Sequence, residues 1–142
     1  MTIEAWVRPV AFADWTTILI KERSGGLSYS LFGSDGANRP PAAYLDISGL
    51  RSIVGTARLP LSAWSHVAVT YDGAMLRLYV NGAQVSAVAQ TGSAAASTSP
   101  LYIGANSIAG HFFNGLIDEI RLYNRALSAA EIVTDMNTPI TR

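Results

Sequence analysis

Apolar and polar residues alternate along most of the chain. From Thr2 to Arg8, the apolar residues Ile3, Ala5 and Val7 occupy every second position. A period of two places neighbouring side chains on opposite faces of a β-strand. Similar short runs, bounded by Gly, Pro, Asn, Asp or Ser, cover residues 16–21, 29–32, 44–47 and 51–54. Short strands with such punctuation predict an all-β sandwich or barrel.

The clearest local signal lies between Ser65 and Val88. Three alternating runs in this segment are separated by the dipeptides Asp72-Gly73 and Asn81-Gly82. Both dipeptides tolerate the positive φ angles of type I′ turns, whose twist matches that of antiparallel strands. We expect a tight hairpin at the second dipeptide and a slightly longer loop at the first, which together form a three-stranded antiparallel meander.

The last part of the chain carries two further strands and the helical pattern. Residues 90–100 are small, polar and unpatterned, and we expect a surface loop there, followed by strands at 101–104 and 113–123. Ser128 to Glu131 has the pattern of a capping box, in which the two side chains satisfy backbone N–H groups at a helix start. A short C-terminal helix should then run to about Met136 and end before Pro139.

Length and composition exclude several classes of protein. The 142 residues fit one domain over 1–142, and 49% of them are apolar, which excludes disorder caused by low hydrophobicity. Ten basic residues balance ten acidic ones, whereas nucleic-acid binding needs clustered Lys and Arg. No stretch approaches the ~18 apolar residues of a membrane span. Without Cys there is no disulfide or thiol catalysis, and because the chain opens on a strand pattern we expect no cleavable signal peptide.

Several segments resemble one family, in order along the chain. Residues 2–9 (TIEAWVRP), 64–73 (WSHVAVTYDG) and 76–82 (LRLYVNG) are followed by 101–104 (LYIG) and by 113–128. These motifs are similar to the first core strand, the central hairpin and the closing block of laminin-G-like jelly-roll domains in the concanavalin A-like lectin/glucanase superfamily. Each motif alone is weak, but the ordered set covers nearly the whole chain.

The resemblance implies an antiparallel two-sheet β-sandwich, a jelly roll, within a larger extracellular or cell-surface protein. Relatives bind glycans, other proteins or extracellular matrix, and some carry a structural calcium ion. Glycoside hydrolases and lyases share the fold. Members usually begin with an earlier strand that pairs beside the closing strand. Since an open edge invites pairing with another chain, we expect a homodimer or strand exchange through the edge that this strand would cover.

Paired carboxylates for hydrolysis are not visible in the sequence. Glycosidases need two carboxylates facing one cleft, ~5–9.5 Å apart. Two carboxylates on one strand share a face only when they stand at positions i and i+2 or i and i+4. Asp118 and Glu119 are adjacent, so we expect them on opposite faces. His66 and His111 lie far apart, and we expect His66 to be a structural imidazole. These observations favour a non-catalytic domain, with hydrolase or lyase activity as the weakest alternative.

Asp118 alternates with Leu116 and Ile120, which predicts a carboxylate that points towards the core. Burial of an unpaired carboxylate is costly, so it needs an arginine such as Arg8 or Arg121, backbone N–H groups or a metal ion. The resemblance implies that an aspartate of the closing strand can ligate calcium together with backbone carbonyls, and calcium takes six to eight oxygens. An ion pair and a structural Ca²⁺ site both stay open.

Aromatic and planar polar residues are the candidates for ligand recognition, because sugars stack on aromatic faces and hydrogen-bond to such groups. The loop at 33–41 has the most suitable composition, whereas Trp6 and Trp64 lie in fold-defining motifs and are assigned to the core or to strand packing. The expected function is a non-catalytic, carbohydrate-binding recognition module of a larger secreted bacterial protein. The alternative is an adhesion domain that contacts proteins without a sugar site. The candidate ligand-binding residues are Trp15, Tyr29, Asp35, Asn38, Arg39, Tyr44, Tyr102, Asn106 and His111.

Overall fold

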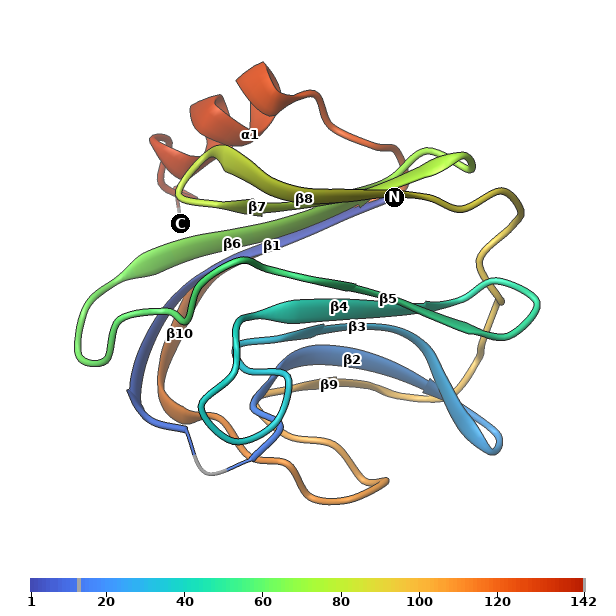
Figure 1. Cartoon of the computed structure of the whole chain (residues 1–142), viewed down its shortest axis with the longest axis horizontal. Helices are drawn as coiled ribbons and strands as arrows, with labels where there is room; N and C mark the ends of the chain where they lie inside the picture. The colour runs from blue at the N-terminus through green and yellow to red at the C-terminus, as the bar shows by residue number, and fades with distance from the viewer. Residues whose placement is uncertain (13, 142) are drawn as a thin grey trace.

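The computed structural model describes residues 1–12 and 14–141, which form two five-stranded antiparallel sheets packed face to face (Figure 1). Sheet A has the order β10-β1-β6-β7-β8 and sheet B the order β5-β4-β3-β2-β9. The predicted all-β sandwich is therefore confirmed. Sheet A comprises β1 (Thr2–Ala11), β6 (Ser65–Tyr71), β7 (Met75–Val80), β8 (Ala83–Ala89) and β10 (Asn114–Tyr123). Sheet B comprises β2 (Thr17–Arg23), β3 (Gly26–Phe32), β4 (Ala42–Asp46), β5 (Leu50–Val54) and β9 (Leu101–Ile103).

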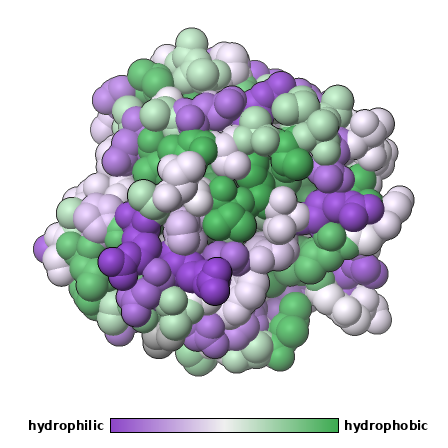
Figure 2. All heavy atoms as spheres, viewed as in Figure 1, coloured by the Kyte–Doolittle hydropathy of each residue, from purple (hydrophilic) through white to green (hydrophobic). Residues whose placement is uncertain are grey.

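The main core fills the space between the two sheets. As the alternation predicts, Ile3, Ala5 and Val7 of β1 are fully buried in it. Their neighbours in the core come from the inward faces of both sheets and include Leu19, Leu31, Leu45, Val67, Val69, Leu76 and Leu78. On the face turned towards the viewer in Figure 2, hydrophobic atoms gather at the centre and hydrophilic ones surround them. The burial of apolar area between the sheets is the main force that holds the sandwich together.

Both turns of the meander have the expected chemistry. Asn81 and Gly82 have φ angles of 50° and 78°, as a type I′ turn requires, and they join β7 directly to β8. A Cβ atom at position 82 would lie 2.9 Å from a methyl carbon of Val133, so this glycine also lets the helix approach the turn. The loop after β6 is longer, and the Asp72 carboxylate accepts hydrogen bonds from two backbone N–H groups within it.

Helix α1 (Ala129–Met136) lies on the outer face of sheet A (Figure 1). The capping box is confirmed, since the Ser128 hydroxyl accepts from the Glu131 backbone N–H and the Glu131 carboxylate accepts from the Ser128 backbone N–H. Ile132 is fully buried and packs against β6 and β7 in a second, smaller core. Helix α1 therefore covers part of the outer face of sheet A, where it buries polar residues that the alternation places outside the main core.

Strand β10 departs from the predicted alternation. Glu119 has a φ of 52° and lies in a β-bulge, where β10 has one more residue than the paired segment of β1. Ile117 and Ile120 pack against the main core, whereas Asp118 is exposed. The prediction of an inward-facing Asp118 is wrong because the extra residue changes the parity between positions 118 and 120. Strand β10 forms one edge of sheet A, and a homodimer through this edge stays a prediction.

Candidate functional site

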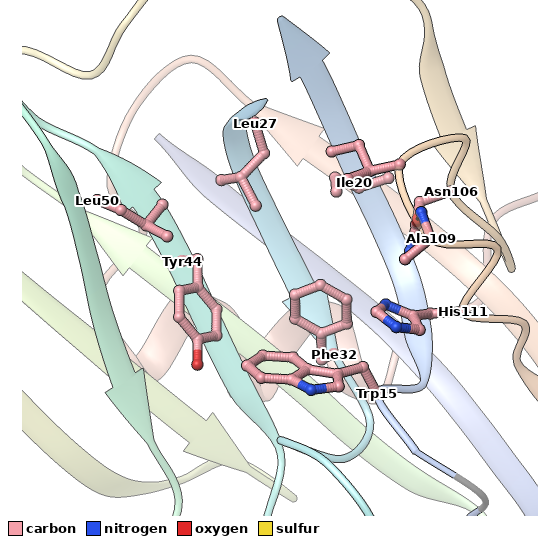
Figure 3. Close-up of a pocket in the computed structure, with 10 residues that line it drawn as sticks. Trp15, Ile20, Leu27, Phe32, Tyr44, Leu50, Asn106, Ala109 and His111 are labelled. Carbon is pink, nitrogen blue, oxygen red and sulfur yellow. The ribbon is translucent and has the colours of Figure 1, made fainter. Parts of the chain in front are cut away.

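A pocket of about 200 Å³ opens on the outer face of sheet B (Figure 3). Ile20, Phe32 and Tyr44 point into it because each directly follows or precedes a core-facing leucine in its strand. The loop between β9 and β10 forms the side wall of the pocket next to β2. The lining is apolar and aromatic apart from two polar side chains, and it consists of Trp15, Ile20, Leu27, Phe32, Tyr44, Leu50, Asn106, Ile108, Ala109 and His111.

Trp15 is the centre of an aromatic cluster in this pocket. Its ring centroid lies 5.4 Å from those of Phe32 and Tyr44, with the planes inclined by 78° and 51°. The His111 imidazole lies nearly parallel to the indole, at a centroid distance of 6.3 Å and an angle of 19°. Edge-to-face and offset contacts of this kind hold aromatic rings in defined orientations. The cluster therefore presents a preformed aromatic surface.

The loop that carries His111 is tied to β2 by buried polar contacts. The Asn106 amide donates to the Thr17 hydroxyl at 2.9 Å, and its carbonyl oxygen accepts from the Ala109 N–H at 2.8 Å. The Glu22 carboxylate accepts from the Ser107 N–H and hydroxyl at 2.7 and 2.6 Å. Asn106 thus positions the loop, and its amide is occupied by these contacts. Glu22, which also holds this loop, was not among the candidate residues identified from the sequence.

Polar groups lie at one rim of the pocket. The Tyr44 hydroxyl donates to Asp35 at 2.6 Å. Burial raises the pKa of Tyr44, and the hydrogen bond to Asp35 raises it further. The Trp15 indole nitrogen and the Arg39 side chain both lie beside Gly36, each 3.9 Å from the position that a Cβ atom would take there. Asp35 and Arg39 therefore lie beside the Tyr44 and Trp15 end of the pocket.

The structure brings together some of the predicted binding residues and separates the others. Trp15, Tyr44, Asn106 and His111 line the pocket, with Asp35 and Arg39 beside it. Asn38 lines a different hollow, next to the loop at 58–61. Tyr29 packs against the main core, where burial raises its pKa, and Tyr102 lies opposite Ile20 on β9 but does not line the pocket.

Several pocket residues were not predicted. The sequence holds a signal for two of them, because Ile20 and Phe32 directly follow core-facing leucines and so break the apolar–polar alternation. When a strand is apolar on both faces, its outward face is either packed against other residues or forms a binding surface. The other lining residues come from strand ends and from the loop before β10, and they carry no such pattern. They are Leu27, Leu50, Ile108 and Ala109.

A second hollow, of about 310 Å³, is lined by Trp6, Trp64, Asp118 and Glu119. It lies on the outer face of sheet A, away from the first pocket. Trp64 is 43% exposed, so its assignment to the core or to strand packing is wrong. The expectation that the two carboxylates face opposite sides is also wrong, since the bulge at Glu119 turns both towards this hollow.

The side chains around Asp118 do not by themselves supply the ligands of a calcium ion, so a site that also uses backbone carbonyl oxygens stays a prediction. Calcium takes six to eight oxygen ligands. The adjacent Glu119 carboxylate is held by the Arg121 guanidinium at 3.1 Å and by the Ile140 N–H at 2.6 Å. Within residues 1–12 and 14–141, no group of three or more His, Asp or Glu side chains is placed to hold a metal. The ion pair with Arg121 that was expected for Asp118 is formed by Glu119 instead.

A polar cluster is buried between sheet A and α1. Glu4 and His66 are fully buried, and Glu4 lies 3.9 Å from the His66 imidazole and 3.7 Å from the Arg121 guanidinium. Burial raises the pKa of Glu4 to about 8, with a further contribution from the charge of Asp135. Burial likewise lowers the pKa of His66 to about 4. The structural interpretation of His66 agrees with these contacts, and its ring packs on Trp6 at 5.4 Å.

Comparison with curated proteins finds related sequences of much greater length. The chain is 34% identical to pappalysin-1 of Mus musculus over an alignment of 116 positions, which covers 74% of this chain and 7% of that protein. It is 35% identical to human pappalysin-1 over an alignment of 80 positions, which covers 53% of this chain and 5% of that protein. The chain therefore spans only a small part of these relatives. In the described part of the chain, no helix is long and apolar enough to cross a membrane.

Solved structures with the same fold include carbohydrate-binding domains. Domain 4 of an extracellular GH43 arabinanase from Geobacillus stearothermophilus, in complex with arabinotriose, aligns with a TM-score of 0.74 and 23% identity over 94% of this chain and 65% of that chain. The CBM40 domain of a Ruminococcus gnavus IT-sialidase, bound to α2,3-sialyllactose, aligns with a TM-score of 0.74 and 16% identity over 94% of this chain and 80% of that chain.

The family is shown by a sequence model. A laminin G model, described as concanavalin A-like lectin/glucanases superfamily, matches residues 1–133. This range contains every strand of both sheets and most of α1. The chain therefore belongs to the concanavalin A-like lectin/glucanase superfamily, the family that its motifs resemble.

Proposed function

We propose that the chain is a non-catalytic carbohydrate-binding module and that the pocket around Trp15 holds a sugar ring. The observation that carries this proposal is the preformed aromatic surface of Trp15, Tyr44 and His111 in an apolar pocket. The C–H face of a sugar is apolar and packs on aromatic rings, whereas its hydroxyl groups need hydrogen-bond partners at the rim. Asp35 and Arg39 are the partners available beside Trp15.

The size of the pocket limits what it can hold. Its volume of about 200 Å³ is below the roughly 300–1,000 Å³ of pockets that enclose drug-sized ligands. One sugar ring can rest in it, and the rest of an oligosaccharide would extend over the exposed Leu50 and Ile108. A pocket of this kind suits recognition of a chain end or of one residue within a chain.

The comparisons support this function without identifying the sugar. The arabinanase domain was solved with arabinotriose and the CBM40 domain with sialyllactose, and both share only the fold with this chain. One fold hosts many activities, so the ligand must be argued from the site. Modules of this kind usually belong to larger extracellular enzymes or adhesins, and we extend the proposal to a secreted or cell-surface parent protein.

Binding of the purified chain to a glycan array, followed by calorimetry with the best ligand, tests the proposal. Trp15→Ala should weaken binding at least tenfold, because it removes the ring on which the sugar stacks. Tyr44→Phe keeps the ring and removes only the hydroxyl that contacts Asp35, so a smaller loss is expected. Trp64→Ala removes an exposed tryptophan on the other sheet and is the matched control.

Three results would contradict the proposal. One is the lack of any reproducible glycan ligand, which would favour the alternative of an adhesion domain that contacts proteins. Another is unchanged binding by a folded Trp15→Ala variant, which would place the sugar elsewhere. Release of product from a bound polysaccharide would show that the chain is an enzyme. Circular dichroism and thermal unfolding of each variant verify that the fold is intact.

A further inference from the structure

We propose that the hollow lined by Trp6, Trp64, Asp118 and Glu119 binds an alkylated ammonium group, such as the side chain of trimethylated lysine. This site lies on sheet A and does not depend on the proposed sugar site on sheet B. Its lining combines two indole rings with two carboxylates and, in the part of the chain that the structure describes, contains no basic side chain.

The bulge in β10 places two acidic side chains where a regular strand would place one. Asp118 lies directly opposite Trp6 in the pairing of β10 with β1. In an unbroken strand, Glu119 would then point towards the core. Its φ of 52° is uncommon for a residue with a Cβ atom. Bulges redirect side chains, and this one brings the Glu119 carboxylate to the side of the sheet on which Asp118 and Trp6 lie.

The two indole rings differ in how they are held. Trp6 is fixed, because its indole N–H donates to the Met136 carbonyl oxygen at 3.3 Å and its ring packs edge-on against His66. Trp64 precedes β6 and is 43% exposed. An indole face attracts a cation that lies within about 6 Å of the ring centroid. A rigid ring and an exposed ring around one hollow can therefore contact two sides of a compact cation.

The charges around the hollow favour a cation over a neutral or anionic ligand. Asp118 and Glu119 line it, and among residues 1–12 and 14–141 an ion pair is formed by Glu119, with Arg121, but not by Asp118. Arg121 is itself 12% exposed and also lies 3.7 Å from Glu4, so it sits behind the hollow. Arg8, on the same face of β1, donates to the Ser62 carbonyl oxygen and does not line the hollow. The carboxylates at the surface are therefore the nearest charges to a bound group.

Alkylation decides which cation fits best. A primary ammonium is strongly hydrated and loses hydrogen bonds that indole rings cannot replace. Methyl groups on the nitrogen spread the charge, reduce hydration and pack against the Trp6 and Trp64 rings. Aromatic side chains recognise quaternary ammonium ligands in this way. The carboxylates of Asp118 and Glu119 attract a quaternary ammonium by charge alone, because this group has no N–H to donate.

Titration of the chain with three amino-acid amides tests this proposal. The probes are Nα-acetyl trimethyllysine amide, the unmodified lysine amide and a neutral analogue with a tert-butyl group in place of the trimethylammonium group. Tryptophan fluorescence or NMR chemical shifts report binding. We expect the trimethylated probe to bind at least tenfold more tightly than either of the others. Trp64→Ala and Asp118→Asn should each weaken its binding, by about tenfold for the first, and Trp15→Ala should have no effect.

The result that overturns the proposal is equal binding of the neutral and cationic probes, which would show a merely apolar site. Lack of binding by the trimethylated probe at millimolar concentration overturns it as well. Loss of glycan binding in Trp64→Ala, without any response to the cation, would make the hollow a second sugar site. Because Trp64 and Asp118 are exposed, both variants should fold, and thermal unfolding verifies this. Failure of the sugar proposal appears separately, as unchanged glycan binding in Trp15→Ala.

Discussion

Replacing Glu4 with glutamine should remove most of the pH dependence of stability between pH 6.5 and 8.5. The Glu4 carboxyl is fully buried under α1, and burial raises its pKa from 4.5 to about 8. The folded state therefore holds this proton far more tightly than the unfolded chain does. Linkage then requires the free energy of unfolding to fall as pH rises towards the folded pKa, because only the folded state still has a proton to lose.

The size of the effect follows from the two pKa values. Between pH 6.5 and 8.5 the unfolded carboxyl is ionised throughout, while the folded one titrates around its pKa of about 8. One pKa unit corresponds to about 1.4 kcal/mol, so this window accounts for roughly 2 kcal/mol of stability. Relaxation around the charge and entry of water reduce such penalties, which makes this value an upper limit.

Urea unfolding of both proteins, followed by tryptophan fluorescence at several pH values, measures the effect. Subtracting the free energy of unfolding of Glu4→Gln from that of wild type at each pH removes the contributions of the other groups that titrate in this window. Glu131→Gln is the matched control, since hydrogen bonds from Ser128 and Arg125 lower the pKa of Glu131 to about 2 and it stays ionised throughout. Parallel pH profiles for wild type and Glu4→Gln would refute the reasoning, because Glu4 would then not be held protonated in the folded state.

Two further predictions concern the helix and calcium. Ile132→Ala should lower the free energy of unfolding by about 2–5 kcal/mol, as loss of a fully buried isoleucine usually does. Val133→Ala, which truncates a 41% exposed neighbour, should change it by no more than about 0.5 kcal/mol in the same urea experiment. Because Asp118 is exposed and Glu119 is paired with Arg121, the melting temperature should be the same in millimolar Ca²⁺ and in EDTA. A clear upward shift in Ca²⁺ would show an ion linked to folding.

The types of the residues were enough to identify several members of the candidate sugar site, but not to show which of them share one pocket. Trp15, Tyr44 and His111 were singled out as aromatic or planar groups near loops, and they line one pocket. Asn38 lies in the same loop as Asp35, yet its side chain lines another hollow. Nothing local distinguishes these two positions, because their surroundings depend on which distant strand or loop covers each of them.

The second hollow was missed for a different reason. Alternation is a reliable guide only while a strand remains regular, and the positive φ of Glu119 interrupts it inside β10. No glycine or proline marks position 119, so the sequence carries no visible sign of the bulge. The exposure of Trp64 was equally hidden, since a tryptophan in a fold-defining motif is usually buried.

The sequence alone determined the elements of this protein that depend on neighbours along the chain. The strands, the Asn81-Gly82 hairpin and the capping box at Ser128 all follow from periods and turn chemistry that act over a few residues. Only the tertiary structure decided which outward faces are covered. In that structure α1 covers Glu4, Trp64 remains exposed to solvent, and His111 packs against Trp15. Burial, and with it pKa and ligand access, depends on segments that lie far apart in the sequence.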